Sequence, residues 1–493
     1  MYSFENESDA DGVSATDGES PTAEGAHAGN GAEQRDTPNA TWTSIRESPQ
    51  EDLERGDQVE LAAELLRRLK GTAHGAQDLV FASGELWRYS PADGAWHVVT
   101  RATQSKMLQL LAGSTVRGGS KPAPLKLGSQ AIYGAMSLAN DRVDIPDFFT
   151  NATSGIAFKN GFVVVDGETV KLLSHSPQHR AVYAYPFDFE PSATPARWLR
   201  ALDDVFRDDE DRAQKIQMIQ EFAGGSLVGI ATRYALALVL VGAGANGKST
   251  VARVIESAFP PALRASIAPQ DMWSEFRVAM LAGKLLNVVS ELPAADIVSS
   301  EKFKAMVTGD RMSGRHIRRN PFDFCPVAGH LFAANALPGT SDLSDGFFRR
   351  FGLLLFNRTF RIDEQDAKLA DNIIESELPG VITWLLQGAA RLSARGGYEM
   401  PASARAACDA WRRDADTVRR FIEERTRPLG AAELDGGTSA RLLYASYKTW
   451  CDEEGVRPVP AVRFGTRAKQ LGHGSVHMKT GNRYRLRLLP PAE

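Results

Sequence analysis

A glycine-rich segment near the middle of the 493-residue chain has residue types that bind phosphate. It matches the pattern G-x-x-x-x-G-K-[ST], between an apolar run that predicts a buried strand and an amphipathic stretch that predicts a helix. In such a loop, backbone N–H groups converge on phosphate oxygens, the lysine reaches the β- and γ-phosphates, and the hydroxyl ligates Mg²⁺. We therefore expect ATP and Mg²⁺ to bind at Gly242, Ala243, Gly244, Ala245, Asn246, Gly247, Lys248, Ser249 and Thr250.

Hydrolysis of a bound nucleotide needs an acidic residue at the end of a neighbouring strand. Leu285 to Val289 predict a second buried strand, and it ends at Ser290 and Glu291. We expect Glu291 to orient or activate the attacking water. Many such ATPases have a second acid where this chain has Ser290, so Mg²⁺ ligation falls mostly on Ser249, with water-mediated contributions expected from Ser290 and Glu291. A surface glutamate that only ends a strand is the alternative.

Three further stretches follow in a fixed order, at 303–324, 330–342 and 345–351. Together with the loop and Glu291, they resemble the motifs of the superfamily 3 helicases of phages, plasmids and large DNA viruses, in particular the group that includes the poxvirus primase-helicase. The resemblance extends over about residues 155–487. It implies a P-loop AAA+-like ATPase core, a hexameric ring, and 3′ to 5′ movement along one DNA strand.

The resemblance also implies roles for residues beyond the loop. Asn335 is similar to the sensor asparagine that positions water against the γ-phosphate, although an asparagine at this position could also begin a turn. Arg349 and Arg350 resemble the arginine finger that reaches the site of the adjacent subunit, and which of the two is the finger stays open.

The segment from Lys304 to Arg315 resembles the motif that precedes a β-hairpin in the central channel. In the family, basic residues of that hairpin bind the DNA backbone. This chain has a cluster of basic residues in the same segment. The alternative is a solvated basic loop. The residues expected to contact single-stranded DNA are Lys304, Arg311, Arg315, His316 and Arg318, beside Arg319.

The end of the chain is basic, since residues 455–493 contain eight Lys and Arg and a single acid. A helix over about 461–471 is expected to present Arg463 and Arg467 outward. A hairpin that turns at Gly481-Asn482 would follow, and its second strand alternates apolar residues with cations. This pattern resembles a winged helix that contacts duplex DNA mainly through phosphates, with a solvated charged face as the alternative. The cations of that strand are Arg483, Arg485 and Arg487.

Composition and periodicity predict a multidomain α/β protein. Residues 1–60 hold fifteen Asp and Glu against three Arg and hardly any apolar residues, which predicts a disordered acidic tail. The expected parts are the tail at 1–58, an N-terminal mixed α/β domain of the primase-helicase group at 59–195, a helical collar or linker at 196–230, the ATPase core at 231–365, a helical connector at 366–427, and a winged-helix-like domain at 428–493.

Several classes of protein are excluded by what the sequence contains. The apolar runs are far shorter than the ~20 residues that span a bilayer, and no secretory signal is evident, so we expect a cytoplasmic protein without membrane contact. Three scattered cysteines argue against a disulfide framework or a zinc site. No paired Asp-x-Asp stands at a strand end of the N-terminal part. We therefore expect no primer synthesis by this chain, and a primase or polymerase would act as a separate partner.

The leading hypothesis is an ATP-dependent replicative DNA helicase of a phage, plasmid or integrated mobile element. One alternative is a DNA-stimulated ATPase that assembles or remodels an origin complex without unwinding. Another is a non-catalytic origin-binding protein, which would leave Glu291 and Asn335 without a purpose.

Overall fold

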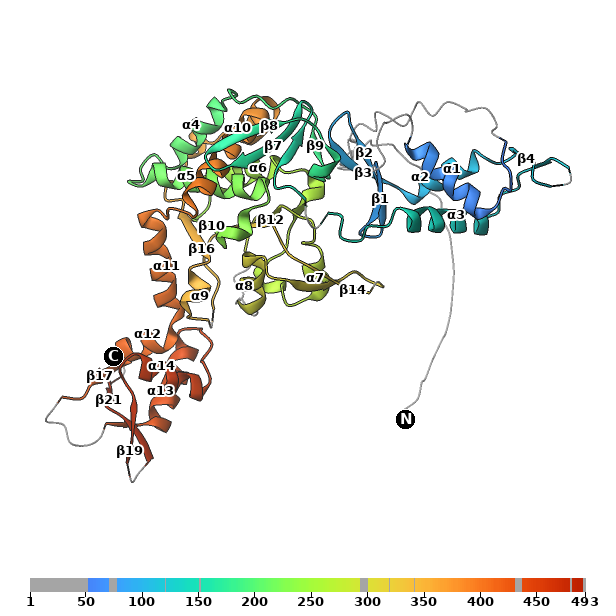
Figure 1. Ribbon diagram of the computed structural model, residues 1–493. Helices are drawn as coiled ribbons and strands as arrows, with labels where there is room; N and C mark the ends of the chain where they lie inside the picture. The colour runs from blue at the N-terminus through green and yellow to red at the C-terminus, as the bar shows by residue number, and fades with distance from the viewer. Residues whose placement is uncertain are drawn as a thin grey trace, which may run out of the picture.

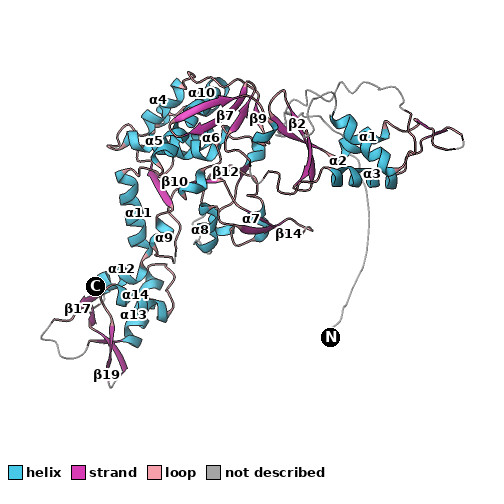
Figure 2. Cartoon of the chain, viewed as in Figure 1, coloured by secondary structure: helices cyan, strands magenta, loops and turns pink. Residues whose placement is uncertain are grey.

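The molecule consists of an N-terminal unit, a central body and a C-terminal unit, which follow one another along its length (Figure 1). Each unit contains both helices and strands (Figure 2), so the expected multidomain α/β class is confirmed. The computed structural model describes residues 52–70, 78–119, 121–149, 152–292, 300–318, 320–340, 342–430, 437–478 and 481–490. The expected tail therefore falls almost entirely outside the described residues.

In the residues that the structure describes, the N-terminal unit contains three helices and two small antiparallel sheets. Helix α1 packs against α3, and the meander β1-β2-β3 forms the hairpins expected from its alternating pattern. Leu53 is 4% exposed and pairs with Val116, so packed structure begins before the expected boundary at residue 58. The elements are α1 (Gln58–Lys70), β1 (Leu79–Ala82), β2 (Glu85–Ser90), β3 (Ala95–Val99), α2 (Arg101–Gln109), β4 (Thr115–Val116), β5 (Ala123–Pro124) and α3 (Ser129–Arg142).

A second sheet joins this unit to the central body. Its strands are β6 (Ile156–Phe158), β7 (Gly161–Asp166), β8 (Thr169–Leu173) and β9 (Ala184–Tyr185), in the order β8-β7-β6-β9. The strands reverse one residue away from each expected turn, at Lys159-Asn160 instead of Asn160-Gly161 and at Gly167-Glu168 instead of Asp166-Gly167. Trp96 of β3 donates its indole N–H to the carbonyl of Pro177, which ties the two sheets together.

A five-stranded parallel sheet forms the centre of the body, in the order β11-β12-β15-β10-β16. The strands are almost entirely buried, as expected of apolar runs in a sheet covered on both faces. Their bounds are β10 (Ala237–Val241), β11 (Arg264–Ala265), β12 (Leu286–Val289), β15 (Gly329–Ala334) and β16 (Phe351–Leu355). Because all five run in one direction, their carboxyl ends meet at one edge, where ligands bind in open α/β sheets.

Helices cover the sheet and hold its edge in place. Helix α10 packs along α5 and also contacts α4 and α6 (Figure 1). Glu221 of α5 is 1% exposed and receives hydrogen bonds from Arg391 and Arg395 of α10. The first part of the expected connector is thus a core helix of the body. The helices are α4 (Ala196–Val205), α5 (Arg212–Leu227), α6 (Lys248–Ser257), α7 (Glu275–Ala279), α8 (Ser300–Thr308), α9 (Asp345–Phe348) and α10 (Leu369–Arg395).

A two-stranded hairpin leaves the body beside α7. Strands β13 (Met312–Arg315) and β14 (Pro321–Phe324) pair antiparallel, and Figure 1 shows β14 extending away from the sheet. Its tip is exposed, and Ile317 there is 78% exposed. The β-hairpin that the sequence predicts downstream of Lys304 is therefore present.

The C-terminal unit packs around one apolar cluster that begins at Val418, ten residues before its expected boundary. The expected hairpin turn at Gly481-Asn482 is wrong, because Met478 pairs with Gly481 and the strands close two residues earlier. The expected continuous second strand is also wrong, since it divides at Arg485 between two sheets. Helix α11 (Ala402–Ala415) precedes the unit and packs against β16 of the central body. The elements of the unit are α12 (Thr417–Arg425), β17 (Thr426–Pro428), β18 (Thr438–Ser439), α13 (Ala440–Glu453), α14 (Ala461–Gln470), β19 (Ser475–Met478), β20 (Gly481–Tyr484) and β21 (Leu486–Leu488).

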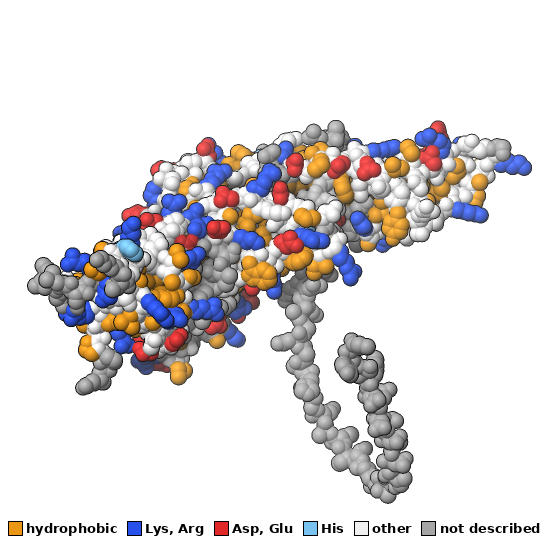
Figure 3. Space-filling model, turned by 90° about the horizontal axis from the view of Figure 1, so that it is seen from below, with side chains coloured by type: hydrophobic (Ala, Val, Ile, Leu, Met, Phe, Trp, Pro, Cys, Tyr) orange, Lys and Arg blue, Asp and Glu red, His pale blue; other side chains and the backbone are white. Residues whose placement is uncertain are grey.

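Charge is spread over the surface. Seen from below, Lys and Arg side chains occur along the whole length of the molecule, interspersed with acids (Figure 3). Among the described residues, no helix is both long and apolar enough to cross a membrane.

Candidate functional site

A pocket of about 640 Å³ opens at the carboxyl edge of the central sheet. Lys248 and Ser249 reach it from the loop between β10 and α6, and Ser290 and Glu291 reach it from the end of β12. Asn335 follows β15 and lies beside them. The structure thus brings together residues that the sequence separates by nearly ninety positions, because three parallel strands end at one place.

The loop between β10 and α6 is shaped by its glycines. Gly247 has a φ of 86°, which side chains disfavour, and a Cβ there would come within 2.7 Å of Val205. Helix α6 begins directly afterwards at Lys248, so its free N–H groups face the pocket. These features are what phosphate binding at a helix N-terminus requires.

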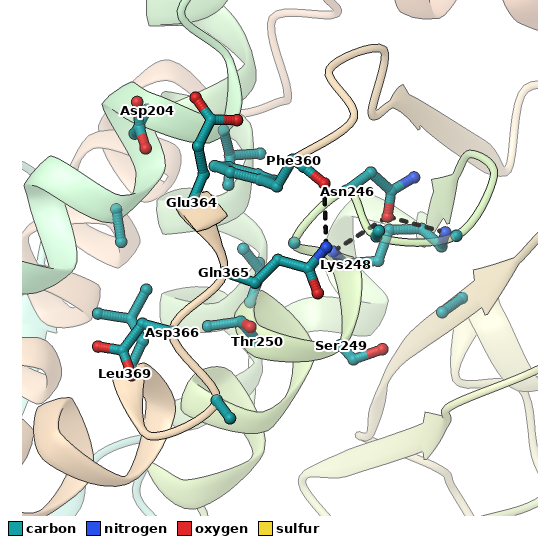
Figure 4. Close-up of a pocket in the computed structure, with 18 of the residues that line it drawn as sticks. Asp204, Asn246, Lys248, Ser249, Thr250, Phe360, Glu364, Gln365, Asp366 and Leu369 are labelled. Atoms are coloured by element: carbon teal, nitrogen blue, oxygen red, sulfur yellow. Dashed lines mark hydrogen bonds between the residues drawn. The ribbon is translucent and has the colours of Figure 1, made fainter. Parts of the chain in front are cut away.

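Lys248 is buried and folded back onto its own loop. Its Nζ donates to the carbonyls of Gly242 at 2.5 Å and Ala243 at 2.9 Å. It also donates to Asn246 Oδ1 at 3.1 Å (Figure 4). Burial lowers the pKa of Lys248, and the nearby Glu291 carboxylate opposes that shift. The ammonium group is therefore held by polar atoms of its own loop, with the Glu291 carboxylate nearby.

The two predicted catalytic side chains lie next to each other. Asn335 Nδ2 donates to Glu291 Oε1 at 3.4 Å, across the adjacent ends of β15 and β12. Both side chains are exposed at the pocket. The carboxylate is thus accessible to a water molecule, and the amide is placed to contact the same water.

Among the described residues that line the pocket, Lys248 is the single cation, whereas four are acids: Asp204, Glu291, Glu364 and Asp366. A triphosphate would therefore meet a wall with an excess of negative charge.

Arg349 and Arg350 do not line the pocket of their own chain. Arg349 is exposed, whereas Arg350 is half-buried and donates to the carbonyl of Gly346. Burial, and secondly the charge of Arg349, lower the pKa of Arg350. The two arginines thus differ in how far each is free to reach another molecule.

The cations predicted to contact DNA are in several environments. Arg311, Arg315, His316 and Arg318 are exposed on or beside the β13–β14 hairpin, and Arg319 lies outside the described residues. Lys304 forms an ion pair with Asp342 at 2.7 Å. Arg463 and Arg485 are exposed, while Arg483 and Arg487 are half-buried.

The prediction that Arg467 faces outward is wrong. Its guanidinium donates to Asp416 Oδ2 at 2.6 and 2.9 Å, and Asp416 is 2% exposed. The helical spacing that placed Arg467 beside Arg463 does not reveal a carboxylate fifty-one positions away.

Two groups of residues near these sites could not be recognised from the sequence. Trp273 is 64% exposed and Phe276 45% exposed, in and beside α7, next to the hairpin. Phe360 and Gln365 line the far wall of the pocket. Sequence neighbours do not distinguish an exposed tryptophan from a buried one. Phe360 and Gln365 belong to an irregular segment after β16 that matches no motif.

Two family models match the chain. Residues 63–207 match the family described as D5 N terminal like, and residues 240–350 match a family of unknown function, DUF5906. The D5-like match relates the chain to phage-type primase-helicases. No curated protein matches the chain.

Solved structures of the NrS-1 C-terminal region resemble the fold in part. An apo structure is 12% identical, with a TM-score of 0.46, and the match covers 87% of this chain and 99% of that one. An A form apo structure is 13% identical, with a TM-score of 0.37, over 66% of this chain and 92% of that one.

Proposed function

We propose that this primase-helicase-related chain is an ATP-dependent DNA helicase with a P-loop ATPase core, working as a ring of identical subunits. The observation that carries the proposal is the convergence of Lys248, Glu291 and Asn335 at the ends of three adjacent parallel strands. A phosphate-binding loop alone would only bind nucleotide. Hydrolysis also requires a group that accepts a proton from water and a group that positions the water, and a carboxylate and an amide beside the loop supply these.

Each side chain has a distinct task in this proposal. The N–H groups at the start of α6 and the Lys248 ammonium bind the phosphates, and Glu291 accepts a proton from the attacking water. Asn335 donates to that water or to Glu291 and so fixes the direction of attack. Because the pocket is open at Glu291, water reaches the carboxylate freely.

Mg²⁺ fits the oxygen donors on this wall. Ser249 supplies a hydroxyl and Glu291 a carboxylate, and no group of three His, Cys, Asp or Glu that could hold a metal gathers among the described residues. A sparse donor set suits Mg²⁺, which keeps several waters and takes substrate phosphates as ligands. When bound, the ion would offset phosphate charge against the acidic wall.

The shortage of cations in the pocket supports a contribution from a neighbouring subunit. With Lys248 as the single cation among the described lining residues, charge that develops on the transferred phosphoryl group has little to stabilise it. Arg349 is exposed and outside its own pocket, which suits an arginine donated to the next subunit. Arg350 is bound to Gly346 and suits a supporting role.

Two surfaces would contact DNA. Arg311, Arg315 and Arg318 surround an exposed hairpin, and the exposed rings of Trp273 and Phe276 could stack on unpaired bases. In the C-terminal unit, a helix followed by strands supports a winged-helix-like mode in which α14 meets duplex DNA with Arg463.

The test compares strand displacement on forked DNA by the full chain and by Lys248→Ala. Displacement by the wild type that requires ATP and is lost in the variant is the expected result. Equal strand displacement by both proteins would overturn the proposal that this chain is an ATP-dependent helicase. ATP-dependent assembly on DNA without displacement would instead support an ATPase that remodels an origin complex.

A further inference from the structure

The pocket extends well beyond the phosphate-binding loop. Its opposite wall consists of Trp198, Ala201, Asp204 and Val205 of α4, and of the segment from Phe360 to Leu369 that follows β16. Figure 4 shows Gln365 reaching from this segment toward the loop that carries Lys248. A cavity of this size holds a small molecule, and triphosphate alone would leave this half unfilled.

Phe360 is fixed in this wall from two sides. Its backbone N–H donates to Ala245 of the loop at 2.8 Å. The Arg358 guanidinium lies 4.2 Å from the centre of its ring, and Arg358 does not itself line the pocket. The contacts with Ala245 and Arg358 therefore hold Phe360 in place, and its ring presents aromatic surface to the cavity. Base stacking on such a ring is favourable for any nucleobase.

Gln365 adds a group with a defined direction. Its Nε2 donates to the Phe360 carbonyl at 3.0 Å, so its Oε1 is left as a hydrogen-bond acceptor at the cavity (Figure 4). An acceptor pairs with the amino group of adenine and opposes the O6 carbonyl of guanine.

The acids on this wall are already engaged. Asp204 and Glu364 both pair with Arg358, at 2.5 and 3.1 Å, and Asp366 accepts from the backbone N–H of Lys368. They are therefore poorly placed to accept the paired N–H groups of guanine.

We propose that Phe360 and Gln365 form a nucleobase subsite that stacks the base and favours adenine over guanine. This inference rests on the proposed binding of a nucleoside triphosphate at the loop. Arg358 is a positioning residue, since it supports the ring and holds both neighbouring carboxylates without entering the cavity.

Equilibrium binding of ATP, GTP and inorganic tripolyphosphate to the full chain with Mg²⁺ tests the subsite. We expect wild type to bind ATP at least roughly 10-fold more tightly than GTP, as a lost hydrogen bond with an unpaired partner implies. Phe360→Ala should weaken ATP binding roughly 10- to 100-fold and leave tripolyphosphate binding unchanged. Gln365→Leu, at an exposed position, should bring the ATP and GTP affinities close together.

Matched controls separate the subsite from the proposed function. Ile362 is 92% exposed and does not line the pocket, so Ile362→Ala should bind all three ligands as wild type does. Lys248→Ala should lose all three. The subsite would be overturned, with the phosphate site unaffected, if wild type bound ATP and GTP with equal affinity. The same conclusion would follow if Phe360→Ala bound ATP normally, or if it lost tripolyphosphate binding as well. A wild type that binds none of the three would overturn the nucleotide function itself.

Discussion

Glu291 and Asn335 face each other at 3.4 Å, each directly beyond the end of one of two adjacent parallel strands. Since β12 and β15 are rigid and buried, the carboxylate and the amide hold a fixed relative position. A water molecule that contacts both would be oriented without rearrangement of either side chain, which is the condition for efficient general-base catalysis.

Glu291→Gln should separate hydrolysis from binding. The amide keeps the shape of the side chain but cannot accept a proton, so ATP turnover should fall by about 10²- to 10⁴-fold while ATP affinity is retained. Steady-state hydrolysis and equilibrium binding measure the two quantities. Glu168→Gln, at an exposed position that does not line the pocket, is the control and should hydrolyse ATP at a rate near that of wild type. Turnover by Glu291→Gln at the wild-type rate would remove Glu291 from the mechanism.

Arg349 and Arg350 should respond differently to replacement. Because Arg349 is exposed, Arg349→Ala should keep its melting temperature and lose ATP turnover by about 10³-fold or more. Arg350→Ala should lower the melting temperature, because Arg350 donates to Gly346 and is half-buried.

A mixing experiment shows whether Arg349 acts between subunits. Arg349→Ala and Lys248→Ala should each be inactive alone, but a mixed ring would contain some pockets with an intact loop and an intact donated arginine. Mixing the two variants should therefore restore part of the hydrolysis. No recovery in a mixture that forms joint assemblies would argue for action within one chain.

Arg463 and Arg467 provide a matched pair on one helix. Arg467→Ala removes two hydrogen bonds from the buried carboxylate of Asp416, which keeps only the longer ion pair with Arg419 at 3.6 Å and its backbone bond, and should destabilise the C-terminal unit by about 2 kcal/mol. Arg463→Ala should leave stability unchanged and weaken duplex DNA binding, with a shallower salt dependence. Thermal melting and DNA titration at several salt concentrations measure both effects. A stable Arg467→Ala variant that only loses DNA binding would place Arg467 at the DNA surface instead.

His330 should make the central body sensitive to mild acid. Burial lowers the pKa of His330 from 6.5 to about 4 within the sheet. The unfolded chain therefore binds a proton more readily below pH 6.5, and stability that is present above that pH is lost as the pH falls toward 4. The loss at pH 5 relative to pH 7 amounts to about 2 kcal/mol. His330→Gln should melt with a smaller difference between these two pH values, and an unchanged difference would exclude His330 as the cause.

The sequence predicted best the parts of the fold that depend on local pattern. The apolar runs at β10 and β12, and the glycine-rich loop between β10 and α6, lie where periodicity and turn chemistry placed them. Parallel strands ending together explain why Lys248, Glu291 and Asn335 meet, since each follows or precedes a strand visible in the sequence.

Contacts between distant segments could not be predicted in this way. Arg467 was expected to face solvent because helical spacing reports only on its own helix, whereas its position is set by Asp416 at the junction of α11 and α12. The hairpin turn was expected at Gly481-Asn482 because glycine and asparagine favour turns, but strand pairing moved it by two residues. Phe360 belongs to no motif, and only its position opposite the loop makes it a candidate.

The wall of the pocket opposite the glycine-rich loop is built from two segments more than 150 residues apart, α4 and the segment that leads into α10. During synthesis, a chain that has emerged only as far as the hairpin at β14 already contains the complete glycine-rich motif and α4. It still lacks the segment that leads into α10, and so it lacks part of the opposite wall of the pocket. Capture of nucleotide would thus coincide with the docking of α10, so that the bound ligand would itself help to complete the last large step of folding.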